Sequence, residues 1–302
     1  MKITLITVCR NSAAVIRTAL ESVLSQRGAE IEYIVVDGGS TDGTVDILDE
    51  YDEKFRHSSL NTHTSSLITF RYISERDEGM YDAMNKGIRM STGDVIGILN
   101  ADDVLASDDT LARVAAAFEA NPDINGTYAD IRFVKDDTDR DRFAFVAAPK
   151  EAGDDKSVRP QSACGASHLR LRNLPTLRYC TGRFFRPWMF RFGVQTAHPS
   201  TFFRRSCFDR WGLYSLNYGM FADFDLLLRF IWKNRARMRY LPLCTTVMRS
   251  GGASTNGWQS TKKINETDLR VLHDNGYYSN KVFLYARYPL KIWGYVFKKG
   301  NS

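Results

Sequence analysis

Two adjacent carboxylates, Asp102 and Asp103, stand close behind a short apolar run at residues 95–99. Two acids at the mouth of a buried strand repel each other, so each favours a nearby cation. Oxygen ligands suit a hard divalent ion such as Mg²⁺ or Mn²⁺, which keeps several waters and bridges to phosphates. Such an ion would neutralise charge on a departing phosphate. The same residues also have a structural explanation, in which Asp103 caps the next helix and Asp102 is solvated.

A second group is the glycine-rich segment at residues 37–43, which begins with Asp37 and contains Ser40, Thr41 and Asp42. Glycines let a backbone approach a ligand closely, and an acid at the end of a strand could accept hydrogen bonds from a base or a ribose. A tight turn closed by side-chain-to-backbone hydrogen bonds explains the same composition. A calcium loop of the EF-hand type does not fit, because its bidentate Glu is missing. Taken alone, the segment is best explained as a turn.

A third group is Asp223 and Asp225, at the start of an apolar helical run at residues 224–232. An acid in this position is most often an N-cap or a first-turn charge. A carboxylate beside a bound substrate could instead remove the proton from an incoming hydroxyl, as a general base does. Positions two apart on a helix diverge, so only one of the two acids can face a given pocket.

Two further segments carry weaker signals. His198, ahead of an apolar run at residues 201–203, is most simply a hydrogen-bonded structural residue, with a ligand role as the alternative. Residues 251–254, Gly-Gly-Ala-Ser, fit either a loop that folds over phosphate or an ordinary turn. Neither segment identifies a function by itself.

The elements that position these groups alternate through residues 1–135. Apolar runs predict strands at residues 3–8, 32–36, 70–74, 95–99 and 127–134. Helical periodicity predicts a helix with its apolar face at residues 15–24, and further helices at residues 44–51, 80–90 and 111–119. This alternation predicts an α/β fold with a mostly parallel central sheet and right-handed crossovers. Ligands of such sheets bind beyond the carboxyl ends of the strands. Asp37, residues 75–79 and residues 100–103 each follow a strand, so we expect them to converge on one rim.

Composition places the chain among globular proteins and points to anionic partners. The 302 residues are 43% apolar and 25% charged, enough for one large α/β domain with an appendage or for two small domains. The net charge of +6 is unevenly spread. Residues 156–208 hold ten basic residues and no acid, and residues 281–302 hold five basic residues and no acid. Phosphates, anionic lipid and nucleic acid are the partners that such stretches suggest.

Cysteine usage and hydropathy indicate a cytosolic protein. The five cysteines are scattered and lack any C-x-x-C spacing, which argues against a disulfide framework and against a structural zinc. The apolar start at residues 3–8 is too short for a signal peptide. No run approaches the roughly 20 apolar residues that a membrane-spanning helix needs. We therefore expect a cytoplasmic chain that does not span a membrane.

In their order along the chain, these segments resemble the family 2 inverting glycosyltransferases, most closely the bacterial branch that assembles surface polysaccharide repeat units. The matching motifs are residues 7–11, 36–44, 74–87, 93–94 and 99–103. The resemblance is strong over about residues 1–135 and loose over about residues 195–255. It implies the GT-A fold, which is the Rossmann-like fold of nucleotide-diphospho-sugar transferases.

The resemblance also implies a division of the chain and roles for particular residues. Residues 1–255 form the catalytic domain, with a nucleotide-binding half at about 1–135, an irregular basic excursion at about 142–195 and an acceptor half at about 196–255; residues 256–302 form a helical basic and aromatic tail. Asp223 is the implied catalytic base and Asp102 the implied ligand of Mg²⁺ or Mn²⁺. The residues implied to bind the nucleotide sugar are Thr7, Arg10, Asp37, Asp77, Gly79, Asn100 and Ser254.

Three positions depart from the family pattern. Asn100 replaces the first Asp of the D-x-D motif, although its side-chain oxygen could accept from a ribose hydroxyl. Ala222 replaces the Glu of a Glu-Asp pair and leaves Asp223 as the base. Arg10 replaces an aromatic residue near the nucleobase, where its planar guanidinium could stack instead.

The activity implied is inverting transfer of a hexosyl or hexosaminyl group from a nucleotide-diphosphate sugar to a hydroxyl of a glycan or lipid-linked acceptor. The Gln-x-x-Arg-Trp signature of processive synthases is absent, which favours a single transfer per encounter. The aromatic and basic tail at residues 281–299 either lies in a membrane interface, at the inner face of the plasma membrane, or packs on the catalytic domain.

Three other functions remain to be weighed against this one. A sugar nucleotidyltransferase usually has a glycine-rich basic loop after its first strand, and residues 9–12 contain no glycine. A non-catalytic nucleotide-sugar or polysaccharide binding protein derived from this fold is favoured only by Asn100 and Ala222. The arginine-rich middle matches no nucleic-acid-binding module, so we expect no nucleic-acid partner.

Overall fold

A computed structural model describes residues 1–60, 67–135, 171–250 and 257–288 of the chain. Its first half contains β1 (Lys2–Cys9), α1 (Ile16–Leu24), β2 (Glu30–Asp37), α2 (Thr44–Leu60), β3 (Leu67–Ser74), α3 (Met80–Met90) and β4 (Val95–Ile98). β1 lies between β2 and β4, β3 lies beside β2, and all these pairs are parallel. β1 and β2 are apolar almost throughout because helices cover both faces of the sheet. The predicted parallel βαβ order is confirmed for this half.

The second half adds strands of both directions. Its elements are β5 (Val104–Leu105), α4 (Thr110–Glu119), β6 (Gly126–Val134), β7 (Thr176–Cys180), η2 (Pro187–Phe192), η3 (His198–Ser200), β8 (Thr201–Arg204), α7 (Arg205–Trp211), η4 (Leu216–Phe221), α8 (Ala222–Leu227), η5 (Leu228–Lys233), β9 (Met238–Arg249), α9 (Gly257–Asp274) and α10 (Lys281–Tyr285). The sheet order is β3-β2-β1-β4-β8-β6-β9-β5, and β7 pairs with β6.

The sheet is mixed rather than mostly parallel, which corrects the prediction. β8 runs antiparallel to both β4 and β6, while β5 and β7 are antiparallel to β9 and β6. Only β6 and β9 restore a parallel pair in this half. Strand direction was not readable from the sequence here because β8 pairs with strands that lie far from it along the chain. The basic excursion, described from residue 171 onward, supplies β7 and η2.

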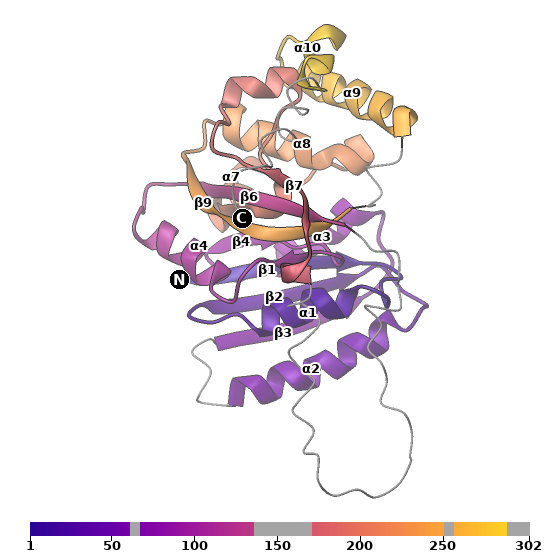
Figure 1. Cartoon of the computed structure of the whole chain (residues 1–302), viewed down its shortest axis with the longest axis vertical. Helices are drawn as coiled ribbons and strands as arrows, with labels where there is room; N and C mark the ends of the chain where they lie inside the picture. The colour runs from indigo at the N-terminus through magenta and orange to yellow at the C-terminus, as the bar shows by residue number, and fades with distance from the viewer. Residues whose placement is uncertain (61–66, 136–170, 251–256, 289–302) are drawn as a thin grey trace, which may run out of the picture.

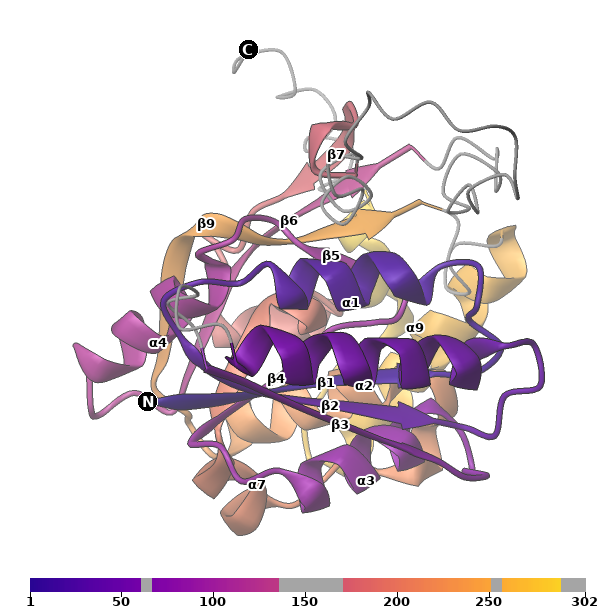
Figure 2. The same ribbon diagram turned by 90° about the horizontal axis from the view of Figure 1, so that it is seen from below.

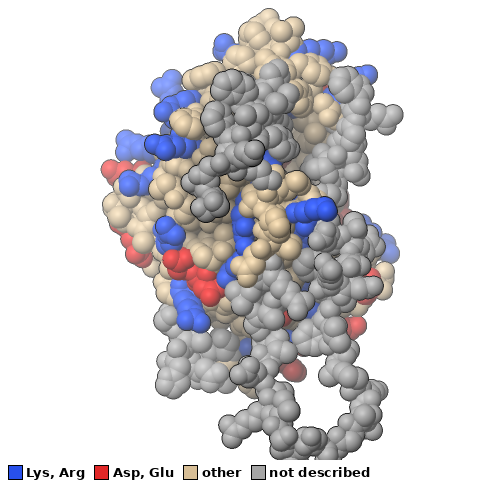
Figure 3. All heavy atoms as spheres, in the orientation of Figure 1, with Lys and Arg blue, Asp and Glu red and all other residues tan. Residues whose placement is uncertain are grey.

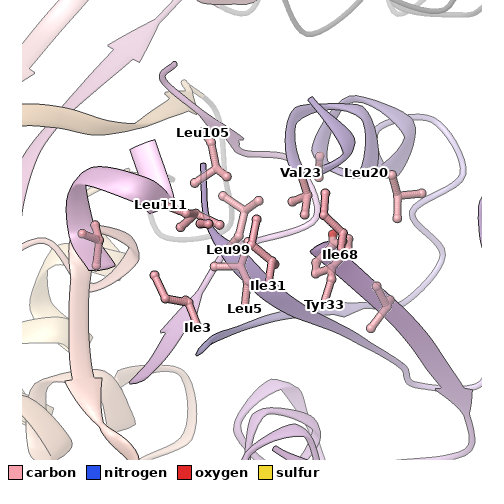
Figure 4. Close-up of a cluster of buried hydrophobic side chains, with 14 of the residues drawn as sticks. Ile3, Leu5, Leu20, Val23, Ile31, Tyr33, Ile68, Leu99, Leu105 and Leu111 are labelled. Carbon is pink, nitrogen blue, oxygen red and sulfur yellow. The ribbon is translucent and has the colours of Figure 1, made fainter. Parts of the chain in front are cut away.

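Two apolar clusters, one on each face of the sheet, hold the strands in place. Figure 4 shows Leu20 and Val23 of α1 packed towards Ile31 and Tyr33 of β2 and Ile68 of β3. The opposite face buries α3 and α8 against alternate residues of the same strands. Figure 2 shows α1 and α2 on one face and α3 and α7 on the other. Because helices pack on both faces of the sheet, the strand ends and the loops that follow them are held in defined positions.

The C-terminal helices α9 and α10 pack beside α8 and η2 (Figure 1). Arg287, only 4% exposed, makes an ion pair with Asp268 of α9, with Nη1 to Oδ2 at 2.8 Å. The same guanidinium donates to the Gly193 carbonyl at 2.5 Å and to Asn265 Oδ1 at 2.5 Å. Leu284 of α10 is fully buried. Leu284 and Arg287 of the tail therefore pack against the rest of the described chain, which was one of the two alternatives for the tail. No helix of the described chain is long and apolar enough to cross a membrane.

Replacing Arg287 by Met is expected to lower the free energy of unfolding by about 3–5 kcal/mol, because the Asp268 carboxylate would stay buried without its cationic partner. Urea denaturation followed by circular dichroism measures this. Lys262→Met is the matched control, since its partner Glu266 lies 3.9 Å away and both side chains are largely exposed. The control should change stability by less than about 1 kcal/mol. Equal effects of the two substitutions would contradict the anchoring role of Arg287.

Candidate functional site

A cavity of 1510 Å³ opens beyond the carboxyl ends of the parallel strands. Loops after β1, β3 and β4 and the start of α8 contribute to its wall. Of the residues expected in the site, it is lined by Arg10, Asp77, Gly79, Asn100, Asp102 and Asp223. The cavity exceeds the roughly 300–1,000 Å³ typical of a single ligand pocket. It therefore has room for two ligands side by side.

Asp102 and Asp103 both line the cavity, and Asp103 is buried whereas Asp102 is half-buried. Asn100 Nδ2 donates to Asp103 Oδ2 at 2.8 Å, which leaves Asn100 Oδ1 as an acceptor. Burial, reinforced by the charge of Asp102, raises the pKa of Asp103 well above its usual value. Asp103 caps no helix, because β5 follows it and α4 begins only at Thr110. The structural explanation of this acid pair is therefore wrong for Asp103.

The described residues contain no group of three or more His, Cys, Asp or Glu side chains that could hold a metal alone. This donor set still fits Mg²⁺ or Mn²⁺, since such ions are often held by one or two carboxylates together with substrate phosphates. Asp102 is the more exposed of the two carboxylates that line the cavity. A cation bound at Asp102 would reduce the electrostatic repulsion between the Asp102 and Asp103 carboxylates.

Asp37 does not line the cavity. Its fully buried carboxylate accepts from the backbone nitrogen of Ser40 at 2.9 Å, from the Ser40 hydroxyl, and from the Ser74 hydroxyl at 2.7 Å. The Cys9 thiol approaches it at 3.5 Å. Burial by itself would raise the pKa of Asp37, but these donors hold it below its usual value. The carboxylate thus joins the ends of β1, β2 and β3.

The loops joined by Asp37 form the rim of the cavity at Arg10 and Asp77. A Cβ on Gly38 would collide with the Asp77 carboxylate, so a larger residue there would require that carboxylate to move. Asp77 Oδ1 in turn accepts from the backbone nitrogen of Gly79 at 2.9 Å, and Gly79 has a φ of 123°, which favours glycine. Gly38 thus serves a contact between two loops, whereas Gly79 serves a turn within its own loop.

Two other expected residues lie away from the cavity wall. Thr7 is fully buried, and its hydroxyl accepts from Tyr33 at 3.0 Å on the α1 side of the sheet. Ser254, with the rest of residues 251–254, lies outside the described residues.

Asp223 is held at both carboxylate oxygens. Gln195 Nε2 donates to Oδ2 at 3.1 Å. The Tyr81 hydroxyl lies 3.2 Å from Asp223 Oδ1 and 3.0 Å from the Met220 carbonyl oxygen. It can donate a hydrogen bond to either acceptor. Burial and the charge of Asp223 both raise the pKa of Tyr81, so its hydroxyl stays protonated and able to donate. No sequence signal indicated Gln195, and Tyr81 belongs to the family-like motif at residues 74–87 without an expected role of its own.

The neighbours of Asp223 are neutral or turned away. His198 lines the cavity, and its Nε2 lies 2.6 Å from the Tyr214 hydroxyl. Burial lowers the pKa of His198, an effect that Asp223 opposes, and the ring is neutral near pH 7. Asp225 is buried and paired with Arg229 at 2.8 Å. Asp223 is thus the acid of this pair that faces the cavity, as the helical spacing predicted.

Comparisons of sequence place the chain among known transferases. The family model described as Glycosyl transferase family 2 matches residues 4–178, more than half of the chain. A PGL/p-HBAD biosynthesis glycosyltransferase of Mycobacterium tuberculosis is 28% identical over 246 residues, which is 82% of this chain and 76% of that protein. An uncharacterized glycosyltransferase of Nostoc sp. is 28% identical over 158 residues, 52% of this chain and 45% of that protein.

Comparisons of structure confirm the expected GT-A fold. The S. aureus TarS 1–349 structure in complex with UDP has a TM-score of 0.52 and 17% identity, covering 89% of this chain and 66% of that one, just under two thirds of its length. A mannosyltransferase of Pyrobaculum calidifontis in complex with GDP-Man and Mn²⁺ has a TM-score of 0.54 and 18% identity, covering 97% of this chain and 72% of that one. At these identities the likeness establishes the fold alone.

Proposed function

We propose that this chain, which belongs to glycosyltransferase family 2, transfers a hexosyl or hexosaminyl group from a nucleotide-diphosphate sugar to an acceptor hydroxyl with inversion. The observation that carries the proposal is the single cavity shared by Asp77, Asp102 and Asp223, which come from distant parts of the chain. One end offers groups suited to a nucleoside and its phosphates. The other offers a carboxylate suited to activate a hydroxyl.

Asp102 and Asn100 are the proposed ligands of a divalent cation and of the donor. Mn²⁺ accompanies the nucleotide or nucleotide sugar in the solved Pyrobaculum mannosyltransferase and in GalNAc-T7 with UDP and GalNAc. Asp102 would hold Mg²⁺ or Mn²⁺, and the ion would supply positive charge against the leaving diphosphate. Asn100 Oδ1 is the proposed acceptor for a ribose hydroxyl, since its amide nitrogen is committed to Asp103.

The nucleoside is assigned to the rim formed by Arg10, Asp77 and Gly79. Arg10 is exposed there and its planar guanidinium can stack on a base. Asp37 and Thr7 remain part of the proposed donor end as buried supports, because Asp37 ties together the strands that carry Arg10 and Asp77. The proposed phosphate-closing role of Ser254 concerns a residue outside the described ranges.

Asp223 is the proposed general base. The acceptor oxygen attacks the anomeric carbon as the bond from that carbon to the diphosphate breaks, and the hydroxyl proton passes to Asp223. Gln195 and Tyr81 fix the carboxylate plane, so its oxygens are already oriented when the acceptor arrives.

The acceptor is proposed to be a glycan carried on a lipid, extended by one sugar per encounter. The cavity is larger than a single donor molecule requires. The tail at residues 281–302 contains aromatic and basic residues and no acid, a composition suited to anionic lipid. We also propose that this tail contacts the inner face of the plasma membrane, and that residues 1–255 and 256–302 act as catalytic domain and appendage.

A panel of nucleotide sugars with and without Mn²⁺ tests the proposal. Metal-dependent thermal stabilisation by one donor identifies it. Mass spectrometry and NMR of the product made with that donor and a lipid-linked acceptor then report transfer and anomeric configuration. Stabilisation without any release of nucleoside diphosphate would instead indicate a binding protein. Absence of both would overturn the proposal.

Tyr81→Phe is expected to lower kcat about tenfold while leaving the KM for the donor nearly unchanged, because the carboxylate loses a donor that helps to orient it. Steady-state kinetics at saturating metal measures the change. Tyr72→Phe is the matched control, since it removes a hydroxyl that bonds Asp49 outside the cavity. If both variants show the same kcat, Tyr81 does not orient the base.

A further inference from the structure

One end of the molecule presents aromatic and aliphatic side chains to solvent. Trp188 of η2 is 58% exposed, Tyr278, which precedes α10, is 66% exposed, and Val282 of α10 is 75% exposed. Together with Phe192 and Phe283 we call these residues the aromatic face. Contiguous exposed apolar surface on a soluble domain marks an interaction site more often than single residues do.

The aromatic face is continuous although its two halves are distant in sequence. The Trp188 ring meets Phe192 edge-on with centroids 5.9 Å apart, and Phe192 stacks on Phe283 at 5.1 Å. Phe283 meets Tyr278 at 6.4 Å. The buried side of α10 is fixed by Leu284 and by the Arg287 ion pair. On its other side, Val282 is 75% exposed when only the described residues are considered.

Basic side chains flank this face. Arg183 and Arg186 precede Trp188, Lys281 precedes Val282, and all three are exposed. Residues 171–208 and 275–288 contain no acid. Among the described residues that Figure 3 colours, Lys and Arg side chains surround the upper end near α10, and the acidic side chains visible in that view lie lower. The face therefore carries a positive field.

The composition and charge fit an anionic lipid surface. Tryptophan and tyrosine rings suit the boundary between headgroups and acyl chains, and basic residues beside them gain about 1 kcal/mol each from anionic lipid. A second copy of the same face would bring like charges together, which disfavours self-association through it. Charge complementarity thus selects a membrane over a dimer.

Neighbours of the face along the chain line the cavity. Met189 of η2 and Tyr288, next to Arg287, line that cavity, far along the chain from the Arg10 and Asp77 rim. We propose that the aromatic face docks on an anionic bilayer and thereby opens the acceptor end of the cavity towards a lipid-borne acceptor. The docking is inferred from the exposure and charge of the aromatic face, whereas its effect on the acceptor rests on the proposed function.

Flotation of the full-length chain with vesicles tests the docking. Wild type is expected to float with vesicles of phosphatidylcholine and phosphatidylglycerol in equal parts, to float poorly with phosphatidylcholine alone, and to dissociate at high salt. Arg186→Glu with Lys281→Glu, and separately Trp188→Ser with Tyr278→Ser, should each weaken binding at least tenfold. Arg89→Glu with Arg113→Glu, on exposed positions of α3 and α4, is the charge-matched control and should float like wild type.

Three outcomes would overturn the docking. One is wild type that stays with the soluble fraction. Another is flotation that survives both face variants but is lost when the chain ends at residue 288, which would assign membrane binding to the later tail. The third is a dimer in solution that Trp188→Ser dissociates. Donor stabilisation by nucleotide sugar is measured without vesicles, so its loss would count against the proposed function and leave the docking result intact.

Discussion

Replacing Asp223 by Asn is expected to lower kcat about 10³-fold while the donor still binds with unchanged affinity. The substitution removes the group proposed to accept the proton of the acceptor hydroxyl and keeps its shape. Gln195 can rotate its amide to accept from the new Asn nitrogen, because its Oε1 has no hydrogen-bond partner in the structure. The fold should therefore be retained, and the loss should be confined to turnover.

Single-turnover kinetics measures the chemical step, and thermal stabilisation by the donor measures binding. Asp209→Asn is the matched control, since Asp209 is exposed on α7 and does not line the cavity. An Asp223→Asn enzyme with more than about a tenth of the wild-type rate would place the base elsewhere, because general base catalysis is worth more than that. His198, which shares the cavity with Asp223, would then be the next candidate.

Asp102→Asn is expected to lower kcat/KM by about 10² to 10³ and to raise the Mn²⁺ concentration needed for half-maximal activity. The uncharged amide is a poorer ligand for a hard cation, so less positive charge reaches the departing diphosphate. Excess Mn²⁺ should recover part of the rate. Removal of metal by EDTA should abolish the activity of wild type.

The metal titration distinguishes this loss from a structural one. Asp123→Asn removes an acid whose side chain is 87% exposed and lies outside the cavity, and it should leave the metal requirement unchanged. A wild-type rate that is insensitive to EDTA would contradict metal dependence. An Asp102→Asn enzyme with the wild-type metal requirement would show that the ion is held by other groups.

Gln195 and Arg287 connect the base to the C-terminal helices. Arg287 binds the Gly193 carbonyl, two residues before the Gln195 that donates to Asp223. The same guanidinium pairs with Asp268 of α9. Packing of the tail therefore fixes a loop that orients the proposed base, so loss of the tail contacts should reduce turnover as well as stability.

The local pattern of the sequence determined the first half of the fold. Continuous apolar runs and helical periodicity predicted β1, β2, β3 and β4 and the helices between them, because burial on both faces of a parallel sheet demands such runs. Strand-end motifs made Asp77 and Asp102 candidates, and a helix-start position made Asp223 one; all three residues line one cavity. The family itself was also identifiable from the order of these motifs, and the family model confirms it.

Tertiary structure alone decided which way side chains at the strand ends turn. Asp37 ends its strand as predicted, yet its carboxylate is turned inward by donors from Ser40, Cys9 and Ser74, the last two on neighbouring strands. The direction of β8, the contact of Gln195 with Asp223 and the aromatic face likewise depend on segments far apart in the chain. Hydrophobic periodicity in the sequence indicates which residues are buried. It does not indicate which group forms a hydrogen bond with a buried polar side chain, because that depends on which strands become neighbours.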